Sequence, residues 1–355
     1  MTNEETILNI KKLKEKFKNR LIIVAHHYQN EDITKLADFV SDSYKLSLFA
    51  SESSAKYIVV CGVKFMVETI KILSKNNQII LTPTLDALCG MASMINEKTL
   101  SAVYKKLKND NNLNIVPIIY INSYMDIKAF CGKNGGSVCT SSNAKKIVEY
   151  YLKKGYSVFF APDYNLGKNI GNSLELKENE IIKINRNLTY DDTNIKNGKL
   201  FLWNGYCCVH KNITLKDIII ARKEHNNAKI IVHPECDEEI VKSSDSYGST
   251  EMIYNTVKNG ESGSEWVIGT ESCFVNRIKN EFRDKNVYEL KESYCGDMKK
   301  ITIKSLYETI KSIENFENGE EKDIEKKLKY VLEIDDSLKK DAKKSLDKMI
   351  EIVSL

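Results

Sequence analysis

The chain carries three weak internal repeats, and this repetition constrains its fold more than any other feature. Each repeat opens with an apolar strand that ends in polar residues, predicted at residues 21–25, 115–119 and 229–232. A short helix follows, then a short strand that runs into a cluster of hydroxyl residues, and then two more strands with helices between them. The resulting order β-α-β-α-β-α-β predicts a parallel sheet covered by helices in every repeat.

The hydroxyl clusters lie where helices should begin. They contain Ser43 in the first repeat, Ser141 in the second, and Ser249 with Thr250 in the third. These residues are predicted N-caps, because Ser and Thr side chains accept hydrogen bonds from the first helical N–H groups. The free N–H groups and the dipole of a helix start attract anions. Ordinary capping would explain one such serine, but three equivalent starts favour anion-binding sites.

A cysteine follows the last strand of every repeat. Cys89 follows a predicted strand at 78–81, Cys207 follows 199–203, and Cys295 follows 287–290. In open parallel sheets ligands bind beyond the carboxyl ends of the strands, so three repeats could direct three thiolates to one shared centre. Three thiolates without a fourth favour an iron-sulfur cluster with one iron left open for chemistry.

The repeats also predict the domain organisation. The expected domains are residues 1–95 with an N-terminal helix, 96–208 with insertions, 209–300, and 301–355 as C-terminal helices packed on the outside. The insertions of the second repeat are predicted to be a loop at 133–136 and a surface hairpin at 174–199, where the pattern alternates and Asn197-Gly198 provides a turn. The C-terminal helices are expected at 305–314 and 336–353, separated by a charged segment at 317–327.

Composition excludes several classes of function. The 53 basic and 49 acidic residues are spread throughout, which gives no nucleic-acid footprint and no polybasic membrane anchor. The longest apolar run, residues 115–121, is too short to span a bilayer, and residues 1–20 read as an amphipathic helix rather than a signal peptide. Nine cysteines without a CxxC pair argue against a disulfide framework. These features predict a cytoplasmic protein that binds neither nucleic acid nor membranes.

Several stretches, in order along the chain, resemble the quinolinate synthase family. They are Ala25-His26-His27-Tyr28-Gln29, the segments 37–43, 61–69 and 139–144, His233-Pro234-Glu235-Cys236, Gly248-Ser249-Thr250 and Gly269-Thr270-Glu271. The resemblance covers about residues 20–305. It implies an α/β fold of three similar α/β/α sandwich domains with parallel sheets around a pseudo-threefold axis, with the active site and a 4Fe-4S cluster at their junction.

The resemblance further implies a reaction and its participants. Iminoaspartate and dihydroxyacetone phosphate condense to quinolinate, with release of phosphate and two waters, on the way to NAD. The enzyme that supplies iminoaspartate is a candidate partner. The cluster ligands implied by the family motifs are Cys89, Cys207 and Cys295. Cys208 falls where the family tends to have an apolar residue and is interpreted as a packing thiol, and Cys61, Cys131, Cys139, Cys236 and Cys273 are expected to have no ligand role.

The polar residues at the strand ends are predicted to bind substrate and to move protons. The predicted substrate-binding residues are His26, Ser43, Tyr120, Asn122, Ser141, His233, Glu235, Ser249 and Thr250. Glu235 and Tyr28 are predicted to transfer protons, and His210 and His233 to orient or polarise substrate oxygens. The open iron would serve as a Lewis acid for the dehydration steps.

Two other functions fit parts of the pattern. A different hydro-lyase that uses an open iron on another dicarboxylate would keep the fold and the cluster, and an assay of candidate substrates would separate the two. A non-enzymatic iron-sulfur or zinc sensor would need a module for DNA or a partner. The sequence has neither a helix-turn-helix pattern nor a basic patch, which disfavours the sensor.

Overall fold

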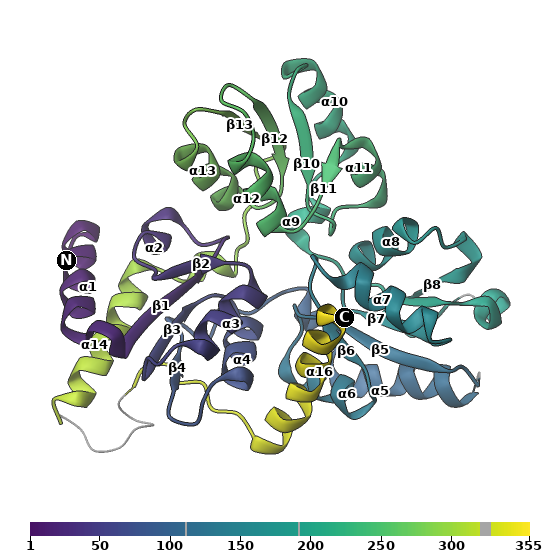
Figure 1. Cartoon of the computed structure of the whole chain (residues 1–355), viewed down its shortest axis with the longest axis horizontal. Coiled ribbons are helices and arrows are strands. Elements are labelled where there is room, and N and C mark those ends of the chain that lie inside the picture. Colours follow the sequence, from purple (N-terminus) through teal and green to yellow (C-terminus); the bar gives the residue numbers. More distant parts are fainter. Residues whose placement is uncertain (111, 191, 320–327) are drawn as a thin grey trace. The chain divides into compact units, whose positions relative to one another are not determined.

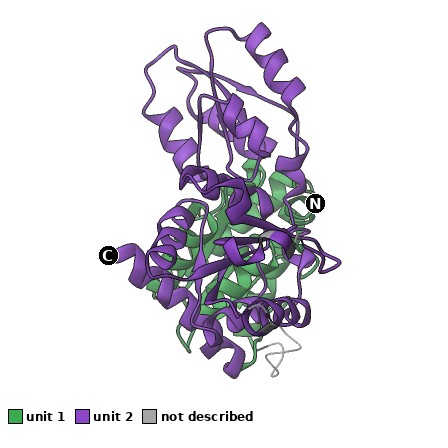
Figure 2. Cartoon of the chain, turned by 90° about the vertical axis from the view of Figure 1, so that its right-hand side faces the viewer, with its two compact units in different colours: residues 1–89, 295–335 green, residues 90–294, 336–355 purple. Residues whose placement is uncertain are grey.

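The computed structural model describes residues 1–110, 112–190, 192–319 and 328–355, and it contains three parallel sheets flanked by helices (Figure 1). The predicted α/β class with three similar parallel-sheet layers is confirmed. The chain divides into two compact units (Figure 2). Unit 1 comprises residues 1–89 and 295–335, and unit 2 comprises residues 90–294 and 336–355.

Unit 1 contains the first sheet. Its strands are β1 (Leu21–His26), β2 (Phe39–Ser41), β3 (Tyr57–Cys61) and β4 (Ile79–Leu81), in the order β2-β1-β3-β4. Its helices are α1 (Asn3–Phe17), α2 (Glu31–Thr34), α3 (Ser43–Glu52), α4 (Lys64–Leu73) and α14 (Ile303–Glu317). Every residue of β3 is buried, as expected for a central parallel strand with both faces covered.

Unit 2 contains two sheets. The first has β5 (Ile115–Tyr120), β6 (Ser137–Cys139), β7 (Ser157–Ala161), β8 (Ile181–Ile184) and β9 (Leu200–Trp203), in the order β6-β5-β7-β9-β8. The second has β10 (Lys229–Val232), β11 (Ser246–Tyr247), β12 (Glu265–Gly269) and β13 (Asn286–Glu289), in the order β11-β10-β12-β13. The helices are α5 (Glu97–Lys105), α6 (Met125–Lys133), α7 (Ala144–Lys153), α8 (Tyr164–Ser173), α9 (Cys208–Lys211), α10 (Leu215–Glu224), α11 (Glu238–Ser243), α12 (Thr250–Lys258), α13 (Ser272–Glu281) and α16 (Asp336–Ser354).

The surface hairpin predicted for residues 174–199 is wrong. Residues 181–184 form β8, which pairs in parallel with β9 at the edge of the sheet. A hairpin would have made the two strands antiparallel, but a helical turn at Asp192–Asn197 carries the chain back before β9 begins. Three isoleucines of β8 are buried and Lys183 is exposed, so the alternating pattern marks an edge strand rather than a surface ribbon.

The two C-terminal helices belong to different units. In unit 1, α14 packs against α1, and Lys16 forms an ion pair with Glu314. In unit 2, α16 packs along α6 (yellow and blue in Figure 1), and the Ser345 hydroxyl donates to the Lys128 carbonyl at 3.0 Å. Both predicted helices are therefore confirmed. Residues 320–327 of the predicted charged segment lie outside the described residues.

Gly132 sets how closely α16 can approach α6. A Cβ atom at this position would lie 2.0 Å from the Asp341 carbonyl oxygen. Gly132→Ala should therefore push the helices apart and lower the free energy of unfolding by about 1–3 kcal/mol. Urea unfolding monitored by circular dichroism would measure the loss. The control Lys133→Ala removes an exposed ion pair with Asp341 and should cost less than about 1 kcal/mol; equal losses would contradict the packing argument.

Among the described residues, no helix is both long enough and apolar enough to cross a membrane.

Candidate active site

The turn after β9 carries Cys207 and His210. Cys207 precedes the first residue of α9, and His210 is buried within this short helix. Gly205 permits the turn, because a Cβ there would lie 2.4 Å from the Pro162 carbonyl oxygen. Met94 fixes the turn from a neighbouring segment: its carbonyl accepts from Trp203 Nε1 at 3.1 Å, and its sulfur lies 3.4 Å from the Tyr206 nitrogen.

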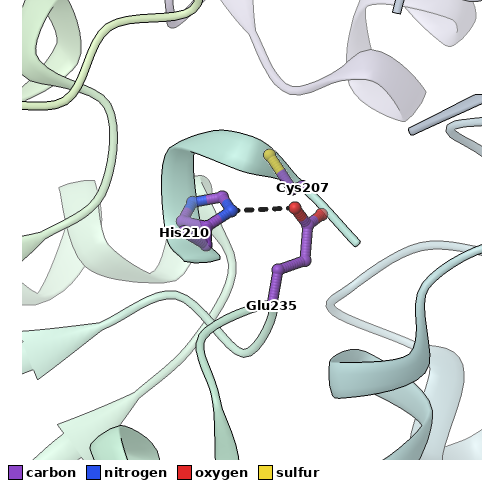
Figure 3. A group of neighbouring side chains, drawn as sticks. All are labelled: Cys207, His210 and Glu235. Carbon is purple, nitrogen blue, oxygen red and sulfur yellow. Dashed lines mark hydrogen bonds and ion pairs between the residues drawn. The ribbon is translucent and has the colours of Figure 1, made fainter. Parts of the chain in front are cut away.

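Glu235 lies at the centre of a buried hydrogen-bond network. Tyr120, the last residue of β5, donates its hydroxyl to Glu235 Oε1 at 2.6 Å. His210 Nδ1 lies 2.8 Å from Glu235 Oε2, with the Cys207 sulfur beside the pair (Figure 3). The carboxyl ends of β5, β9 and β10 thus bring these side chains together. Tyr120, His210 and Glu235 are each less than 5% exposed.

Two further residues surround the His210 ring. The Thr270 hydroxyl, just after β12, lies 3.0 Å from His210 Nε2. His233 stacks on the ring with centroids 4.4 Å apart and planes inclined by 12°. His233 Nδ1 accepts the Glu235 backbone N–H at 3.3 Å, so a neutral His233 carries its proton on Nε2. The network therefore contains residues from four separate strand ends of unit 2.

The charges in the network are set by burial and by its members. Burial by itself would raise the pKa of Glu235. The neighbouring His233 and His210, with hydrogen bonds from His210 and Tyr120, outweigh burial and lower that pKa to about 2. Burial, with His210 next in importance, lowers the pKa of His233 to about 3. At neutral pH Glu235 is ionised and His233 is neutral, so the His210 Nδ1 that faces the carboxylate must carry a proton.

Helix α8 forms hydrogen bonds with the backbone on both sides of Glu235. The Asn165 side-chain amide donates to the Glu235 carbonyl at 3.2 Å. The Asn169 amide donates to the carbonyls of Pro234 and Cys236, each at 2.9 Å. Neither these two residues nor Thr270 had been predicted from the sequence to belong to the site. Thr270 lies in a motif that carries the family resemblance, whereas the buried polar pair four residues apart on one helix was the available sign for Asn165 and Asn169.

Cys207, His210 and Glu235 could in principle hold a metal ion. Their donor atoms all lie within 4.8 Å of one another. However, both ring nitrogens of His210 and both carboxylate oxygens of Glu235 already have hydrogen-bond partners. A metal bound by all three residues would break those bonds. The existing hydrogen bonds therefore disfavour a metal site made of all three residues.

Comparison with known proteins decides the family. The family model described as Quinolinate synthetase A protein matches residues 8–351. The chain belongs to this family. A protein from Bacillus cytotoxicus named quinolinate synthase is 37% identical, with 99% of this chain and 95% of that protein covered. Proteins of the same name from Listeria innocua and Bacillus pumilus are also 37% identical, covering 99% and 98% of this chain and 95% and 92% of their own.

Membership of the quinolinate synthetase A family confirms the resemblance and the prediction of an enzyme of this kind. Among solved structures, one titled as the E-1-hydroxy-2-methyl-but-2-enyl-4-diphosphate reductase from Plasmodium falciparum is 14% identical and covers 86% of this chain and 83% of its own. The TM-score of this match is 0.29.

The first and third repeats of this family member share a local geometry just after their first strands. In unit 1, His26 ends β1, and its Nδ1 accepts the Tyr28 backbone N–H at 3.2 Å. In unit 2, His233 accepts the Glu235 N–H in the same way. Tyr28 and Glu235, both predicted to transfer protons, therefore occupy equivalent positions two residues after a histidine at a strand end.

Ser141 and Ser249 line one pocket of unit 2. The pocket has a volume of about 240 Å³, and Lys145, Asn169 and Tyr247 also line it. Thr250 is buried as the first residue of α12, and Asn122 is half-buried on the loop after β5. The structure thus brings two predicted substrate-binding residues to a common cavity. In unit 1, Ser43 is buried as the first residue of α3.

The capping predictions hold in one case of three. The Ser249 hydroxyl accepts the Met252 N–H at 3.3 Å and caps α12, as predicted. The prediction is wrong for Ser43, because the Asp42 carboxylate caps α3 by accepting from Tyr44 and Lys45. It is also wrong for Ser141, because the segment 140–143 forms its own turn, closed by a bond from the Thr140 N–H to the Asn143 side chain at 2.7 Å, before α7 begins.

The cysteines separate by exposure. Cys61, Cys131, Cys139 and Cys236 are buried, and burial raises the pKa of each thiol, which keeps it protonated and unsuited to ligation. Cys89, Cys207 and Cys295, the predicted cluster ligands, are half-buried, and so is Cys273, which is predicted to have no ligand role. Cys208 is exposed, so its interpretation as a packing thiol is wrong. In α9 the buried positions are Val209 and His210 instead.

Proposed function

We propose that this chain condenses iminoaspartate with dihydroxyacetone phosphate to form quinolinate, with release of phosphate and water, in NAD biosynthesis. The observation that carries the proposal is the buried Tyr120–Glu235–His210 network beside the Cys207 thiol, in a chain of the quinolinate synthetase A family. The proposed setting is the cytoplasm, and the enzyme that supplies the unstable imine is the proposed partner.

The proposed cofactor is a 4Fe-4S cluster held by Cys89, Cys207 and Cys295. Contacts within unit 1 support the pairing of the first and last ligands. Lys300 donates to the Asp86 carbonyl at 3.0 Å, and the Lys299 N–H donates to the Cys295 carbonyl at 3.2 Å. The loop that leads to Cys89 is therefore tied to the turn that follows Cys295. Half-buried thiols on such loops are accessible to iron.

Contacts within unit 2 support the inclusion of Cys207. Met94, five residues after Cys89, binds Trp203 and Tyr206 on the turn that carries Cys207. The Ser293 hydroxyl donates to the Val209 carbonyl at 2.9 Å, and the chain reaches Cys295 two residues after Ser293. The Cys207 turn is thus bound to the segments that continue toward both other cysteines. When bound, the cluster would supply a Lewis-acidic iron for loss of water.

The protein's own residues would bind the substrates and move protons. Glu235 is ionised before substrate arrives and so enters the reaction as a base, and an anionic substrate beside it would raise its pKa. Tyr28 is the second proposed proton-transfer residue. His210 and the neutral His233 would orient substrate oxygens, together with His26, Tyr120 and Asn122. With a Lewis-acidic iron, loss of water would not require a strong acid among the neighbouring side chains.

The pocket shared by Ser141 and Ser249 is the proposed site for an anionic substrate group. The N-terminus of α12, which begins at Thr250, offers free N–H groups and the positive end of a helix dipole. Lys145 adds a positive charge to the lining. Ser43, at the start of α3, is proposed to play the corresponding part in the first repeat. Both substrates carry carboxylate or phosphate groups that such sites recognise.

An anaerobic assay tests the proposed function. The protein would be purified without oxygen and supplied with dihydroxyacetone phosphate and freshly generated iminoaspartate, and quinolinate would be quantified alongside iron and sulfide per chain. Quinolinate formation that depends on both substrates is the expected result. Turnover of another dicarboxylate without quinolinate would favour a different open-iron hydro-lyase, and a bound cluster without any turnover would favour the sensor.

Oxygen should inactivate the enzyme faster than it unfolds it. A cluster iron without a protein ligand is open to oxidants as well as to substrate, whereas the packed core does not depend on oxygen. Activity and circular dichroism would be followed in air, with and without quinolinate. Quinolinate should slow the inactivation, while nicotinate, which lacks one carboxylate, is the matched control. Equal inactivation rates with and without quinolinate would mean that the product does not cover the oxygen-sensitive centre.

A further inference from the structure

The loop that follows β5 carries Asn122 in a tight backbone turn. The Ile121 N–H donates to the carbonyl of Cys139, on the neighbouring strand β6, at 2.8 Å. The Ser123 N–H donates back to the Ile121 carbonyl at 2.8 Å. Asn122 is therefore the central residue of a three-residue turn, with a buried residue on either side. The direction of its side chain depends on how firmly the backbone is held at both ends of this turn.

Lys128 binds the end of the turn that leads away from the sheet. It lies in the first half of α6 and is completely buried. Helical side chains lean toward the N-terminus of their own helix, so the long lysine side chain reaches back over the start of α6. Its amino group donates to the Ser123 carbonyl. The buried Ser123 hydroxyl has no hydrogen-bond partner among the described residues, so the bond from Lys128 is the side-chain contact that holds Ser123.

The backbone of Lys128 is itself fixed. Its N–H donates to the Tyr124 carbonyl at 3.2 Å, and its carbonyl accepts from the Ser345 hydroxyl of α16 at 3.0 Å. A lysine is rarely buried so completely unless its amino group is hydrogen-bonded, because removing that group from water is costly. A methionine would fill the same space without this cost. Packing alone therefore does not account for a lysine here, whereas the bond to the turn does.

We propose that Lys128 is a positioning residue that keeps the turn at Asn122 in the conformation that binds substrate. Lys128 acts through the turn, and the part played by Asn122 rests on the proposed function. Without the amino group, the buried Ser123 carbonyl would lose its partner, which should disfavour this conformation by about 5- to 150-fold. A smaller population of the competent turn weakens the apparent affinity in proportion, whereas a molecule that has bound substrate reacts as before.

The chain offers a matched control for this proposal. Lys128→Met keeps the length of the side chain and removes the amino group, and Lys128→Leu is a second variant should the methionine variant not fold. The control is Lys285→Met, which also removes a buried lysine amino group from unit 2. Lys285 is 9% exposed, and its amino group pairs with the adjacent Asp284 at 2.8 Å. It precedes β13, at the opposite edge of its sheet from the carboxyl ends of the strands.

A kinetic comparison separates positioning from a loss of folded protein. Both kcat and the KM of each substrate would be measured for the full-length, anaerobically purified variants, with Asn122→Ala alongside. The KM that rises in Asn122→Ala should also rise in Lys128→Met, by about 5- to 150-fold, with little change in kcat. A merely structural defect would instead lower kcat per chain and leave KM unchanged. Lys285→Met should keep both constants.

A double variant tests whether Lys128 acts through Asn122. If it does, Lys128→Met combined with Asn122→Ala should raise KM no further than Asn122→Ala alone, because the two changes remove the same interaction. Additive losses, or an unchanged KM in Lys128→Met, would overturn the proposal. So would a rise of KM in Lys285→Met that equals the rise in Lys128→Met.

Hydrogen exchange tests the turn without any turnover. The N–H groups of Ile121 and Ser123 are both hydrogen-bonded, so their exchange with deuterium reports how often the turn opens. Exchange should be faster in Lys128→Met and unchanged in Lys285→Met. Equal exchange in wild type and Lys128→Met would contradict the proposal. If the wild-type protein made no quinolinate, the proposed function would fail, while these exchange rates would still decide whether Lys128 holds the turn.

Discussion

Replacing Cys207 with alanine should abolish both the visible iron-sulfur absorption and quinolinate formation, whereas Cys208→Ala should retain both. A methyl group cannot replace a thiolate ligand, while the exposed Cys208 thiol contributes little to packing. Iron and sulfide per chain, the visible spectrum and anaerobic turnover of the two variants would be measured side by side. Because the two cysteines are adjacent, the pair provides its own matched control.

The same experiment extends to the other cysteines. Cys89→Ala and Cys295→Ala should behave like Cys207→Ala. Cys131→Ala should keep the cluster, because Cys131 is buried and its thiol donates to the Pro117 carbonyl at 3.3 Å. A full cluster in Cys207→Ala together with its loss in Cys208→Ala would show that the ligand is the other neighbour. The exposure of Cys208 makes that comparison necessary.

Glu235→Gln should lower turnover by ~10²–10⁴-fold while the cluster stays intact. Glutamine keeps the size of the side chain but removes the negative charge and the base. It also places an amide NH₂ where Glu235 now accepts from either Tyr120 or His210. Anaerobic quinolinate production and cluster absorption would be measured on the same sample, so that a loss of catalysis can be distinguished from a loss of the cluster.

Tyr120→Phe is the companion variant for Glu235. It removes one hydrogen bond to the ionised carboxylate and leaves the carboxylate in place. A loss of about 10- to 150-fold is expected, because hydrogen bonds to charged groups contribute about 1.5–3 kcal/mol. Near-normal turnover of Glu235→Gln with a full cluster would instead reject Glu235 as the proton-transfer residue and direct attention to Tyr28 or His233.

The strands could be predicted because the sequence pattern of a strand is local and recurs in each repeat. A run of apolar residues that ends in polar ones marks a buried parallel strand, and β10 has the predicted bounds of residues 229–232. The repetition also predicted the order of strands and helices along each repeat. The same logic placed Tyr120, His210, His233 and Glu235 at strand ends, where the structure brings them together.

The contacts among these residues were not predictable from local pattern. Thr270 meets His210 across sixty positions of sequence, and Asn169 meets Pro234 across 65. Only the folded sheets determine which strand ends become neighbours. The hairpin prediction for the β8 segment was wrong for a related reason. An alternating segment can pair on either side and in either direction, and its parallel pairing with β9 depends on the connection at Asp192–Asn197.

The hydrogen bonds from α8 to the loop that carries Glu235 make the third repeat depend on the second. Asn169 uses its amide to bind two carbonyls of a loop that belongs to the next sheet, and Asn165 binds a third. The position of the carboxylate is therefore inherited from the second repeat, although the residue belongs to the third. If the repeats arose by duplication, they have since become dependent on one another. An engineer who transplanted residues 209–294 alone would carry over Glu235 without the support that aims it.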